Sequence, residues 1–218
     1  MAEQILLKPK GFRQHLENFW YHYKLHTILT LFLVAVLAIG VTQCVMRENP
    51  DYKIIVCMDK YVPDDVLEAM RKHITAYAED VNGDGKVVVH MVDASLPDNQ
   101  QNPQVRGSQA AKLQAELQMG ETMLFLTDQV KFDMLGDLQV FEETDYLPDC
   151  GGRALNLKGT PFAEAVNAVY DNFISHDVYL SKRLVKGTDF EKNEVSVKNE
   201  ADAVKLLRRL LEAEKPAA

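Results

Sequence analysis

Residues 27–46, TILTLFLVAVLAIGVTQCVM, form twenty consecutive positions without a charged side chain. A helix rises about 1.5 Å per residue, so this segment is long enough to cross the roughly 30 Å hydrocarbon core of a bilayer. Trp20, Tyr21 and Tyr23 precede it, and such amphipathic rings favour the boundary between lipid and water. We therefore predict one transmembrane helix over residues 27–46.

A signal peptide and a buried core helix are the other interpretations of this segment. A signal peptide has a shorter apolar region of about 7–15 residues and a small-residue cleavage site, whereas this run ends in Gln43 to Met46. A core helix of a soluble domain would show a polar face, which these residues lack. We therefore expect an uncleaved signal anchor.

The basic residues beside the span predict its orientation. Four Lys or Arg residues precede the span and three follow it within about 20 positions, and the more basic flank tends to stay in the cytoplasm. We expect residues 1–26 to form a cytoplasmic juxtamembrane segment. The protein would then lie in the cell membrane as a single-pass chain, with its large carboxyl-terminal domain outside.

The residues after the span suffice for one compact domain. Residues 47–218 number 172. The chain has 24 Lys and Arg and 32 Asp and Glu; four bases and two acids lie in residues 1–26, which leaves 20 bases against 30 acids. Nucleic-acid binding needs a basic face, so nucleic acid is excluded as a partner. We expect a linker over residues 47–52 and one acidic extracytoplasmic domain over residues 53–218.

Three apolar runs separated by helical patterns predict a mostly parallel sheet. The runs at residues 53–58, 86–92 and 122–127 are continuous rather than alternating, as in strands that are covered on both faces. Helical patterns lie between them, and a strand–helix–strand order implies right-handed crossovers. The fold class predicted is therefore α/β, as a three-layer domain with a mostly parallel sheet behind the amino-terminal transmembrane helix.

The helices are predicted from apolar stripes and from capping residues. A first stripe follows residues 61–65 and consists of Val66, Met70, Ile74 and Tyr77. Ser108 is expected to cap a helix that ends at Gly120, and Asn199 to cap the last helix of the chain.

Weaker patterns cover the rest of the domain. They predict helices at residues 129–135 and 162–173 and strands at residues 154–157 and 177–185.

The stretches KIIVCMD, VVVHMVDAS and AELQMGETMLFLTD carry a family resemblance. In their order they resemble the first lobe of extracellular solute-binding proteins of the periplasmic type 2 fold, over residues 53–128. The whole chain is also similar to uncharacterised single-span bacterial membrane proteins that carry such a domain outside. Because 172 residues are too few for two ordinary lobes, the resemblance implies one shortened lobe.

The carboxyl ends of the predicted strands are the expected place for a ligand. In an open α/β sheet, ligands bind in the crevice beyond these ends. The candidate ligand-binding residues are Asp59, Lys60, Tyr61, Asp93, Ser95, Thr127 and Asp128. The alternative is that these acids cap helices or face water.

The stretch DVNGDGKV at residues 80–87 matches the first half of a calcium loop. Asp80, Asn82 and Asp84 would supply oxygen ligands, but position twelve of such a loop is Met91 instead of an acid. The candidate cofactor is therefore a structural calcium ion, and the alternative is a helix-to-strand turn, for which these residue types are suited.

Cys57 and Cys150 are the two cysteines of the outer domain, and an oxidising exterior would permit a disulfide between them. Two buried thiols are the alternative.

Motifs for catalysis are lacking, because no GxSxG, HExxH, P-loop or GxGxxG pattern occurs. We therefore expect a noncatalytic, membrane-anchored recognition protein that binds a small ligand or a neighbouring protein. The alternative is a structural or assembly subunit of an envelope or membrane complex that has no small-molecule site.

Overall fold

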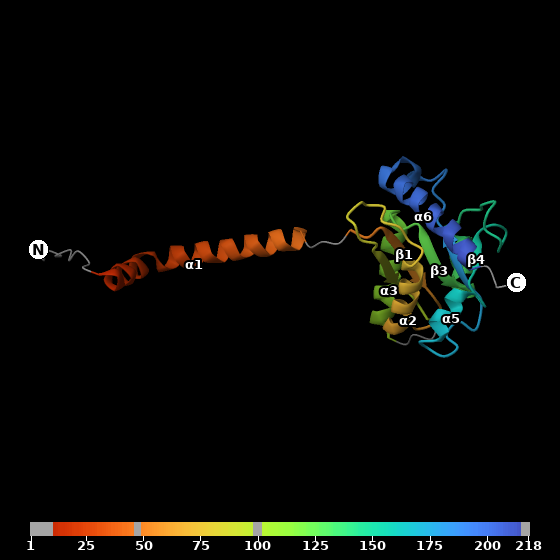
Figure 1. Cartoon of the computed structure of the whole chain (residues 1–218), viewed down its shortest axis with the longest axis horizontal. Coiled ribbons are helices and arrows are strands. Elements are labelled where there is room, and N and C mark those ends of the chain that lie inside the picture. Colours follow the sequence, from red (N-terminus) through yellow and green to blue (C-terminus); the bar gives the residue numbers. More distant parts are fainter. Residues whose placement is uncertain (1–10, 46–48, 98–101, 215–218) are drawn as a thin grey trace, which may run out of the picture. The chain divides into compact units, whose positions relative to one another are not determined.

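A computed structural model describes residues 11–45, 49–97 and 102–214 (Figure 1). The chain divides into two compact units, Met1–Glu48 and Asn49–Ala218. Parts of four predicted segments lie outside the described residues: residues 1–10 of the juxtamembrane segment, Met46 of the span, residues 47–48 of the linker, and residues 98–101 and 215–218 of the domain.

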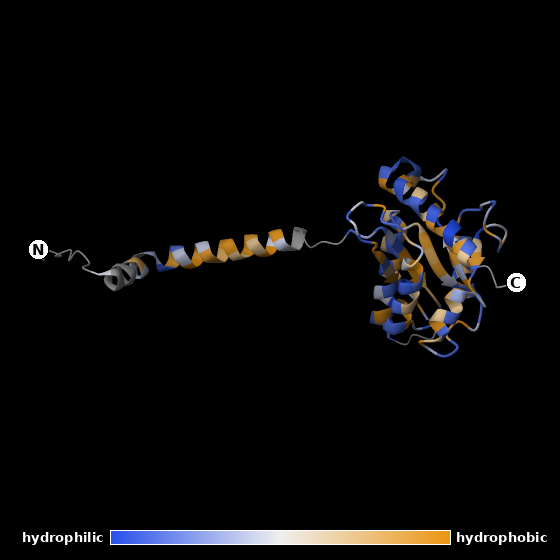
Figure 2. Ribbon diagram, in the orientation of Figure 1, coloured by the Kyte–Doolittle hydropathy of each residue, from blue (hydrophilic) through white to orange (hydrophobic). Residues whose placement is uncertain are grey.

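Among the described residues, the amino-terminal unit forms one helix, α1 (Phe12–Val45), of 34 residues. Within it, Tyr23–Thr42 is long and apolar enough to cross a membrane, and none of this stretch is buried inside the protein. Figure 2 shows the apolar colour along this part of the helix. The stretch overlaps the predicted span from Thr27 to Thr42, and it is compatible with a transmembrane helix or a signal anchor.

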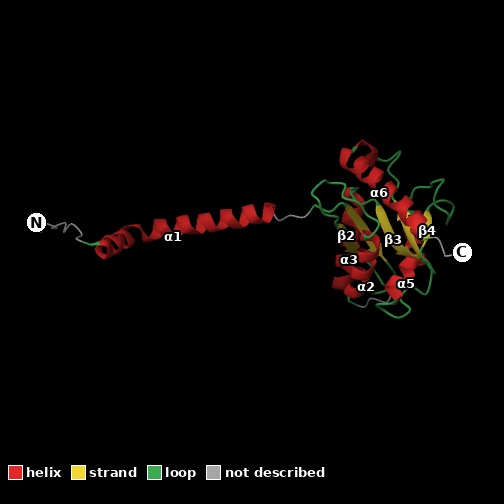
Figure 3. Ribbon diagram, in the orientation of Figure 1, coloured by secondary structure: helices red, strands yellow, loops and turns green. Residues whose placement is uncertain are grey.

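The globular unit contains one five-stranded sheet of order β2-β1-β3-β5-β4 (Figure 3). The strands are β1 (Tyr52–Cys57), β2 (Val89–Asp93), β3 (Leu124–Asp128), β4 (Ala154–Asn156) and β5 (Val178–Lys182). β1 pairs in parallel with β2 and β3, whereas β5 runs antiparallel to both β3 and β4. Four strands therefore point one way and β5 points the other, which confirms a mixed α/β fold with a mostly parallel sheet.

The helices of the globular unit pack their apolar side chains into two buried clusters. The helices are α2 (Asp64–Thr75), α3 (Pro103–Met119), α4 (Gln129–Asp137), α5 (Pro161–Asn167), the short 3₁₀ helix η1 (Asp189–Lys192) and α6 (Glu194–Ala213). One cluster joins Ile54 and Val56 of β1 to α2, α5 and α6. The other joins Ile55 and Cys57 to α3 and α4. Adjacent residues of β1 therefore enter different clusters, as the alternation of side chains along a strand requires.

The predicted stripe on α2 is confirmed at three of its four residues, but two predicted helix caps are wrong. Val66, Met70 and Ile74 are all buried, whereas Tyr77 lies beyond the end of α2 and packs against the same cluster only partly buried. Helix α3 is capped by Asn102 and begins at Pro103, so it starts before Ser108. The Ser108 hydroxyl instead donates to the Val105 carbonyl inside the helix.

Helix α6 likewise starts before its predicted cap. Its cap is Asn193, and Asn199 lies inside the helix, where its side-chain amide donates to the Glu121 carbonyl. In both helices the apolar residues of the first turn, Val105 in α3 and Val195 and Val197 in α6, are exposed, so the buried apolar stripe begins later than the helix does.

Two buried cations hold β5 in place. The Lys182 ammonium contacts the carboxylates of Glu142 and Glu200, and these contacts outweigh burial and raise the pKa of Lys182. The Arg183 guanidinium donates to the carbonyls of Glu116 and Leu117 in the last turn of α3, which is where a helix favours positive charge. Burial lowers the pKa of Arg183 to about 10. These contacts fix the strand whose other end forms part of the candidate site.

Candidate functional site

Three strands bring polar side chains to one edge of the sheet. β1 and β3 end there, and β5 begins there because it runs antiparallel to β3, with Asp128 paired to Val178. The residues just after β1, at the end of β3 and just before β5 are therefore neighbours. This edge is the one at which the sequence places a ligand.

Asp59 and Asp128 lie side by side at this edge. One carboxylate oxygen of Asp128 accepts from the Asp59 amide at 2.6 Å, and the other accepts from the Lys131 amide at 3.0 Å, as the cap of α4. The buried Lys131 ammonium lies 3.1 Å from a carboxylate oxygen of Asp59. These charged groups hold the ends of β1 and β3 together, which agrees with the alternative that the acids cap helices.

Lys60 connects the end of β1 to the segment between α5 and β5. Its ammonium donates to the Phe173 carbonyl at 2.5 Å and lies 3.8 Å from the centre of the Phe173 ring. Burial lowers the pKa of Lys60, and the nearby Asp128 carboxylate opposes that shift. Lys60 therefore lies between the end of β1 and the segment before β5 and contacts both.

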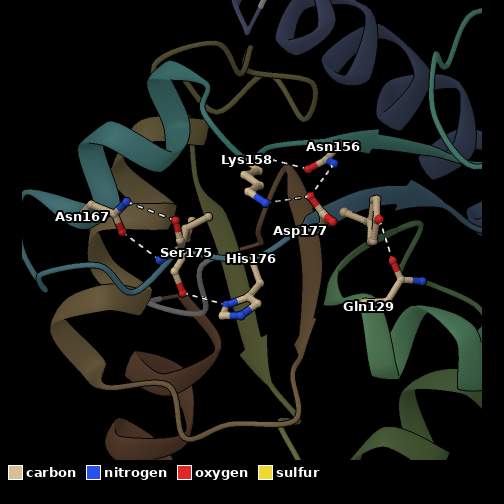
Figure 4. A network of polar contacts seen from close by, with 9 residues as sticks. Gln129, Asn156, Lys158, Asn167, Ser175, His176 and Asp177 are labelled. Atoms are coloured by element: carbon tan, nitrogen blue, oxygen red, sulfur yellow. Dashed lines mark hydrogen bonds and ion pairs between the residues drawn. The ribbon is translucent and has the colours of Figure 1, made fainter.

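The segment before β5 is fixed by side-chain hydrogen bonds (Figure 4). The Asn167 amide group accepts from the Ile174 amide at 2.8 Å and donates to the Ile174 carbonyl at 3.3 Å, so it closes the loop as a neighbouring strand would. The Ser175 hydroxyl lies 2.8 Å from Nδ1 of His176. The Asp177 carboxylate accepts from the Asn156 side chain at 3.0 Å. The loop is therefore held at both ends.

Two neighbouring hollows open at this edge and share Lys60 and His176 in their walls; together they are called the edge groove. The first hollow has a volume of about 410 Å³ and is lined by Asp59, Lys60, Asp128, Gln129, Val130, His176, Asp177 and Val178. The second, called the tyrosine hollow, has a volume of about 460 Å³ and is lined by Lys60, Tyr61, Pro63, Tyr170, Asp171, Asn172, Phe173, Ser175 and His176.

A smaller hollow of about 280 Å³ lies at the opposite edge, where β1 begins beside α6. The edge groove is the better candidate because it is larger and because residues from three strand ends converge on it.

The structure separates the seven predicted ligand-binding residues into two sets. Asp59, Lys60, Tyr61 and Asp128 line the edge groove. Asp93, Ser95 and Thr127 are not among its lining residues, and their contacts place them in other roles.

Two of these three residues support the backbone after β2, and the third is buried. The Ser95 hydroxyl accepts from the Met58 amide at 3.2 Å, and the Asp93 carboxylate accepts from the Ser95 amide at 2.9 Å. Thr127 is fully buried, and the sheet register places it between Cys57 and Tyr179.

Sequence reasoning missed Gln129, Tyr170, His176 and Asp177, which also line the edge groove. His176 and Asp177 stand at the start of the predicted strand at 177–185, so their position beside a strand was visible in the sequence. The direction of that strand was not, because nothing in its composition distinguishes an antiparallel neighbour of β3 from a parallel one.

The candidate calcium residues form a turn that binds its own amides. The Asp80 carboxylate accepts from the amides of Gly83 at 2.6 Å and Gly85 at 2.8 Å, and these hydrogen bonds lower the pKa of Asp80. Oδ1 of Asn82 and of Asp84 each accept from the amide two residues further on. In the described part of the chain, no three His, Cys, Asp or Glu side chains gather as metal ligands would. The geometry favours the turn, and calcium stays a prediction.

Cys57 and Cys150 are both free thiols in the structure. Cys57 belongs to the cluster under α3 and α4, and Cys150 packs against that cluster. Burial raises the pKa of Cys57 to about 12 and also raises the pKa of Cys150. The Tyr179 hydroxyl donates to the side-chain oxygen of Gln129 at 2.7 Å, and burial raises the pKa of Tyr179 to about 12. These groups are neutral at pH 7.

No protein-family model, curated protein or solved structure matches this chain. The resemblance of residues 53–128 to one lobe of a solute-binding protein therefore stays a prediction from the sequence.

Proposed function

We propose that this chain is a membrane-anchored recognition protein whose globular domain lies outside the cytoplasm and binds a ligand in the edge groove without catalysis. The observation that carries this proposal is the pair of hollows, of about 410 and 460 Å³, that share Lys60 and His176. Ligand pockets have volumes of about 300–1,000 Å³, and in open α/β sheets they lie beyond the carboxyl ends of strands.

The noncatalytic assignment is supported by what the charged groups at the groove contact. Asp128 accepts two backbone amides, Asp59 is paired with Lys131, and Lys60 donates to a backbone carbonyl. These groups fix the shape of the groove, as a binding site requires.

The anchor and the layers belong to the same proposal. The apolar stretch Tyr23–Thr42 supports one membrane crossing, and the more basic amino-terminal flank supports an amino terminus in the cytoplasm. The two buried clusters, one with α2, α5 and α6 and one with α3 and α4, support a three-layer arrangement. Protease added to intact cells should digest residues 49–218; full protection of this unit in intact cells would contradict the orientation.

The test of binding is a thermal-shift screen of the full-length protein in lipid nanodiscs. Amino acids, sugars and peptides are added, and unfolding of the globular unit is followed by circular dichroism. A compound at about 100 times its Kd stabilises the folded state by about 2.7 kcal/mol, which raises the midpoint by roughly 5–11 °C for a unit of this size.

A blocking variant and a matched control make the screen specific for the groove. Val130→Arg places a long cation in the first hollow, because Val130 lines it and is 51% exposed. Val197→Arg makes the same change at an exposed position on α6 that is not among the lining residues of either hollow. For a ligand of the first hollow, the shift should disappear in Val130→Arg and persist in Val197→Arg. A ligand of the tyrosine hollow should instead lose its shift in Tyr170→Ala, because Tyr170 lines that hollow and is 50% exposed. A screen without any shift, or a shift that both groove variants leave unchanged, would contradict the proposal.

A second candidate function, a subunit that docks on a neighbouring protein, is favoured by one observation. Val130, Met134 and Leu138 recur every four residues along α4 and its carboxyl end, and they are 51%, 36% and 64% exposed. Residues at this spacing share one helix face, and exposed apolar faces are a feature of interaction sites. Leu138→Glu should abolish co-purification of a membrane partner while leaving any small-molecule shift intact; unchanged co-purification would contradict docking at this face.

A further inference from the structure

The tyrosine hollow presents two exposed aromatic rings. Tyr61, just before α2, is 74% exposed, and Tyr170, just after α5, is 50% exposed. Both line the same hollow although they are more than a hundred residues apart in the chain. Aromatic side chains combine a flat apolar face with a polar tip and are enriched at binding surfaces.

The wall that carries Tyr170 is rigid. The Phe173 amide donates to the Tyr170 carbonyl at 3.2 Å, and Asn172 takes a left-handed conformation with φ of 56° inside that turn. The rings of Tyr170 and Phe173 meet edge to face, with centres 6.0 Å apart. Because Asn167 also clamps Ile174, a ligand would order little of this loop on binding, and a preformed site keeps more of its contact energy.

The charges in the tyrosine hollow favour a neutral ligand. The hollow contains one ammonium, that of Lys60, and one exposed carboxylate, that of Asp171. These two opposite charges offset each other, so a ligand with a net charge is attracted by one group and repelled by the other, and a net charge brings it no overall advantage. Lys60 also already lies over the Phe173 ring, so that aromatic face is not available to a ligand cation.

The polar atoms around the hollow include both donors and acceptors. Tyr61, Tyr170, Asp171 and Asn172 are exposed and line the hollow, so a ligand can reach the polar atoms of their side chains. A ligand that satisfies them must both donate and accept hydrogen bonds. A proline-rich peptide, which also favours aromatic grooves, lacks amide donors and would leave the Asp171 carboxylate unpaired.

A flat apolar face surrounded by hydroxyl groups is the chemistry of a pyranose ring. We propose that the tyrosine hollow binds a sugar ring of a neutral oligosaccharide, with its C–H face against Tyr61 or Tyr170 and its hydroxyls on Asp171 and Asn172. This inference rests on the proposed function and names the ligand class of the same groove.

The test uses the full-length protein in nanodiscs, prepared without glycoside detergents because these would compete. Neutral gluco-, manno- and chito-oligosaccharides are tested by saturation-transfer NMR and calorimetry. At least one should bind, with saturation strongest at ring C–H protons. At least one of Tyr61→Ala and Tyr170→Ala, the variant that lacks the ring on which the sugar stacks, should weaken binding at least about tenfold, as the loss of a central aromatic contact does. Tyr61→Phe and Tyr170→Phe keep the ring and should stay within about threefold of the natural protein.

Two outcomes would overturn the inference: no neutral saccharide binds, or the alanine variants bind as tightly as the natural protein while circular dichroism shows them folded. If peptides or amines shift the midpoint in a way that Val130→Arg abolishes while saccharides do not bind, the sugar assignment fails and the proposed function stands. If no compound of any class binds, both fail.

Discussion

Replacing Glu214 by alanine should destabilise the globular unit, because this carboxylate fastens the end of α6 to two other helices. One of its oxygens lies 2.6 Å from Nε2 of His73 on α2, and the other accepts from the Phe162 amide in the first turn of α5 at 2.8 Å. The Glu214 side chain is fully buried. Glu214→Ala leaves a buried amide without an acceptor and His73 without its partner.

The size of the effect follows from those two contacts. An unsatisfied buried amide costs about 1–3 kcal/mol, and a hydrogen bond to a charged group contributes about 1.5–3 kcal/mol. The His73 side chain is 12% exposed, so water can replace part of its contact, and we take the lower part of the sum, about 2.5–4 kcal/mol. For a unit of this size, that lowers the midpoint by roughly 5–15 °C.

The assay is thermal unfolding in nanodiscs, followed by circular dichroism. Glu212→Ala is the matched control, because Glu212 lies two residues earlier on α6 and is exposed, so its midpoint should stay near that of the natural protein. If Glu214→Ala melts within about 2 °C of Glu212→Ala, the reasoning about the buried carboxylate is refuted.

The same contact predicts a pH dependence. Burial by itself raises the pKa of Glu214, but hydrogen bonds from His73, the Phe162 amide and Thr160 outweigh it and hold that pKa below its ordinary value of 4.5. A carboxyl with a lowered pKa stabilises the fold above its unfolded pKa, and this contribution is lost as pH falls through the folded value. The stability difference between the natural protein and Glu214→Gln should therefore shrink below pH 4.5; a difference that grows on acidification would contradict this sign.

Three further predictions concern single positions. Gly120→Ala should destabilise the globular unit by at least about 2 kcal/mol, because Gly120 has a φ of 69° and an added Cβ would overlap the Phe190 ring. Gly107→Ala, in open space on α3, should instead stabilise it by about 0.5–1 kcal/mol. Denaturant titration of both variants measures the difference in the free energy of unfolding. Cys57 should resist alkylation at pH 8 until the domain unfolds, because it is buried with a pKa of about 12, and mass spectrometry of its peptide with and without urea checks this. Asp80→Ala should lower the midpoint equally with millimolar calcium and with a chelator, because its carboxylate serves the turn; a calcium-dependent difference would restore the metal interpretation.

The parts of the fold that could be predicted from sequence are those in which the buried residues recur at the period of a helix or a strand. The stripe on α2 was visible because Val66, Met70 and Ile74 all face one core. The caps of α3 and α6 were misplaced because Asn102 and Asn193 precede first turns in which no apolar side chain is buried.

The candidate site was predicted only where it depends on parallel strands. Asp59 and Lys60 follow β1, and Asp128 is the last residue of β3; the shared direction of these two strands is implied by the helices between them. His176 and Tyr170 depend on β5, whose antiparallel pairing to β3 is a long-range choice that local composition does not encode. Asn172 has a positive φ in the turn that places Tyr170, but an asparagine by itself predicts such a turn only weakly.

The clamp that Asn167 forms on Ile174 has a consequence for redesign. Because the Asn167 side chain closes the loop, the exposed residues 168–172 can be exchanged for other sequences without disturbing the register of β5, provided that the buried Phe173, which contacts Lys60, is kept. The domain is thus a scaffold for grafted loop libraries, in which new binding specificities are selected while the sheet and its helices remain constant.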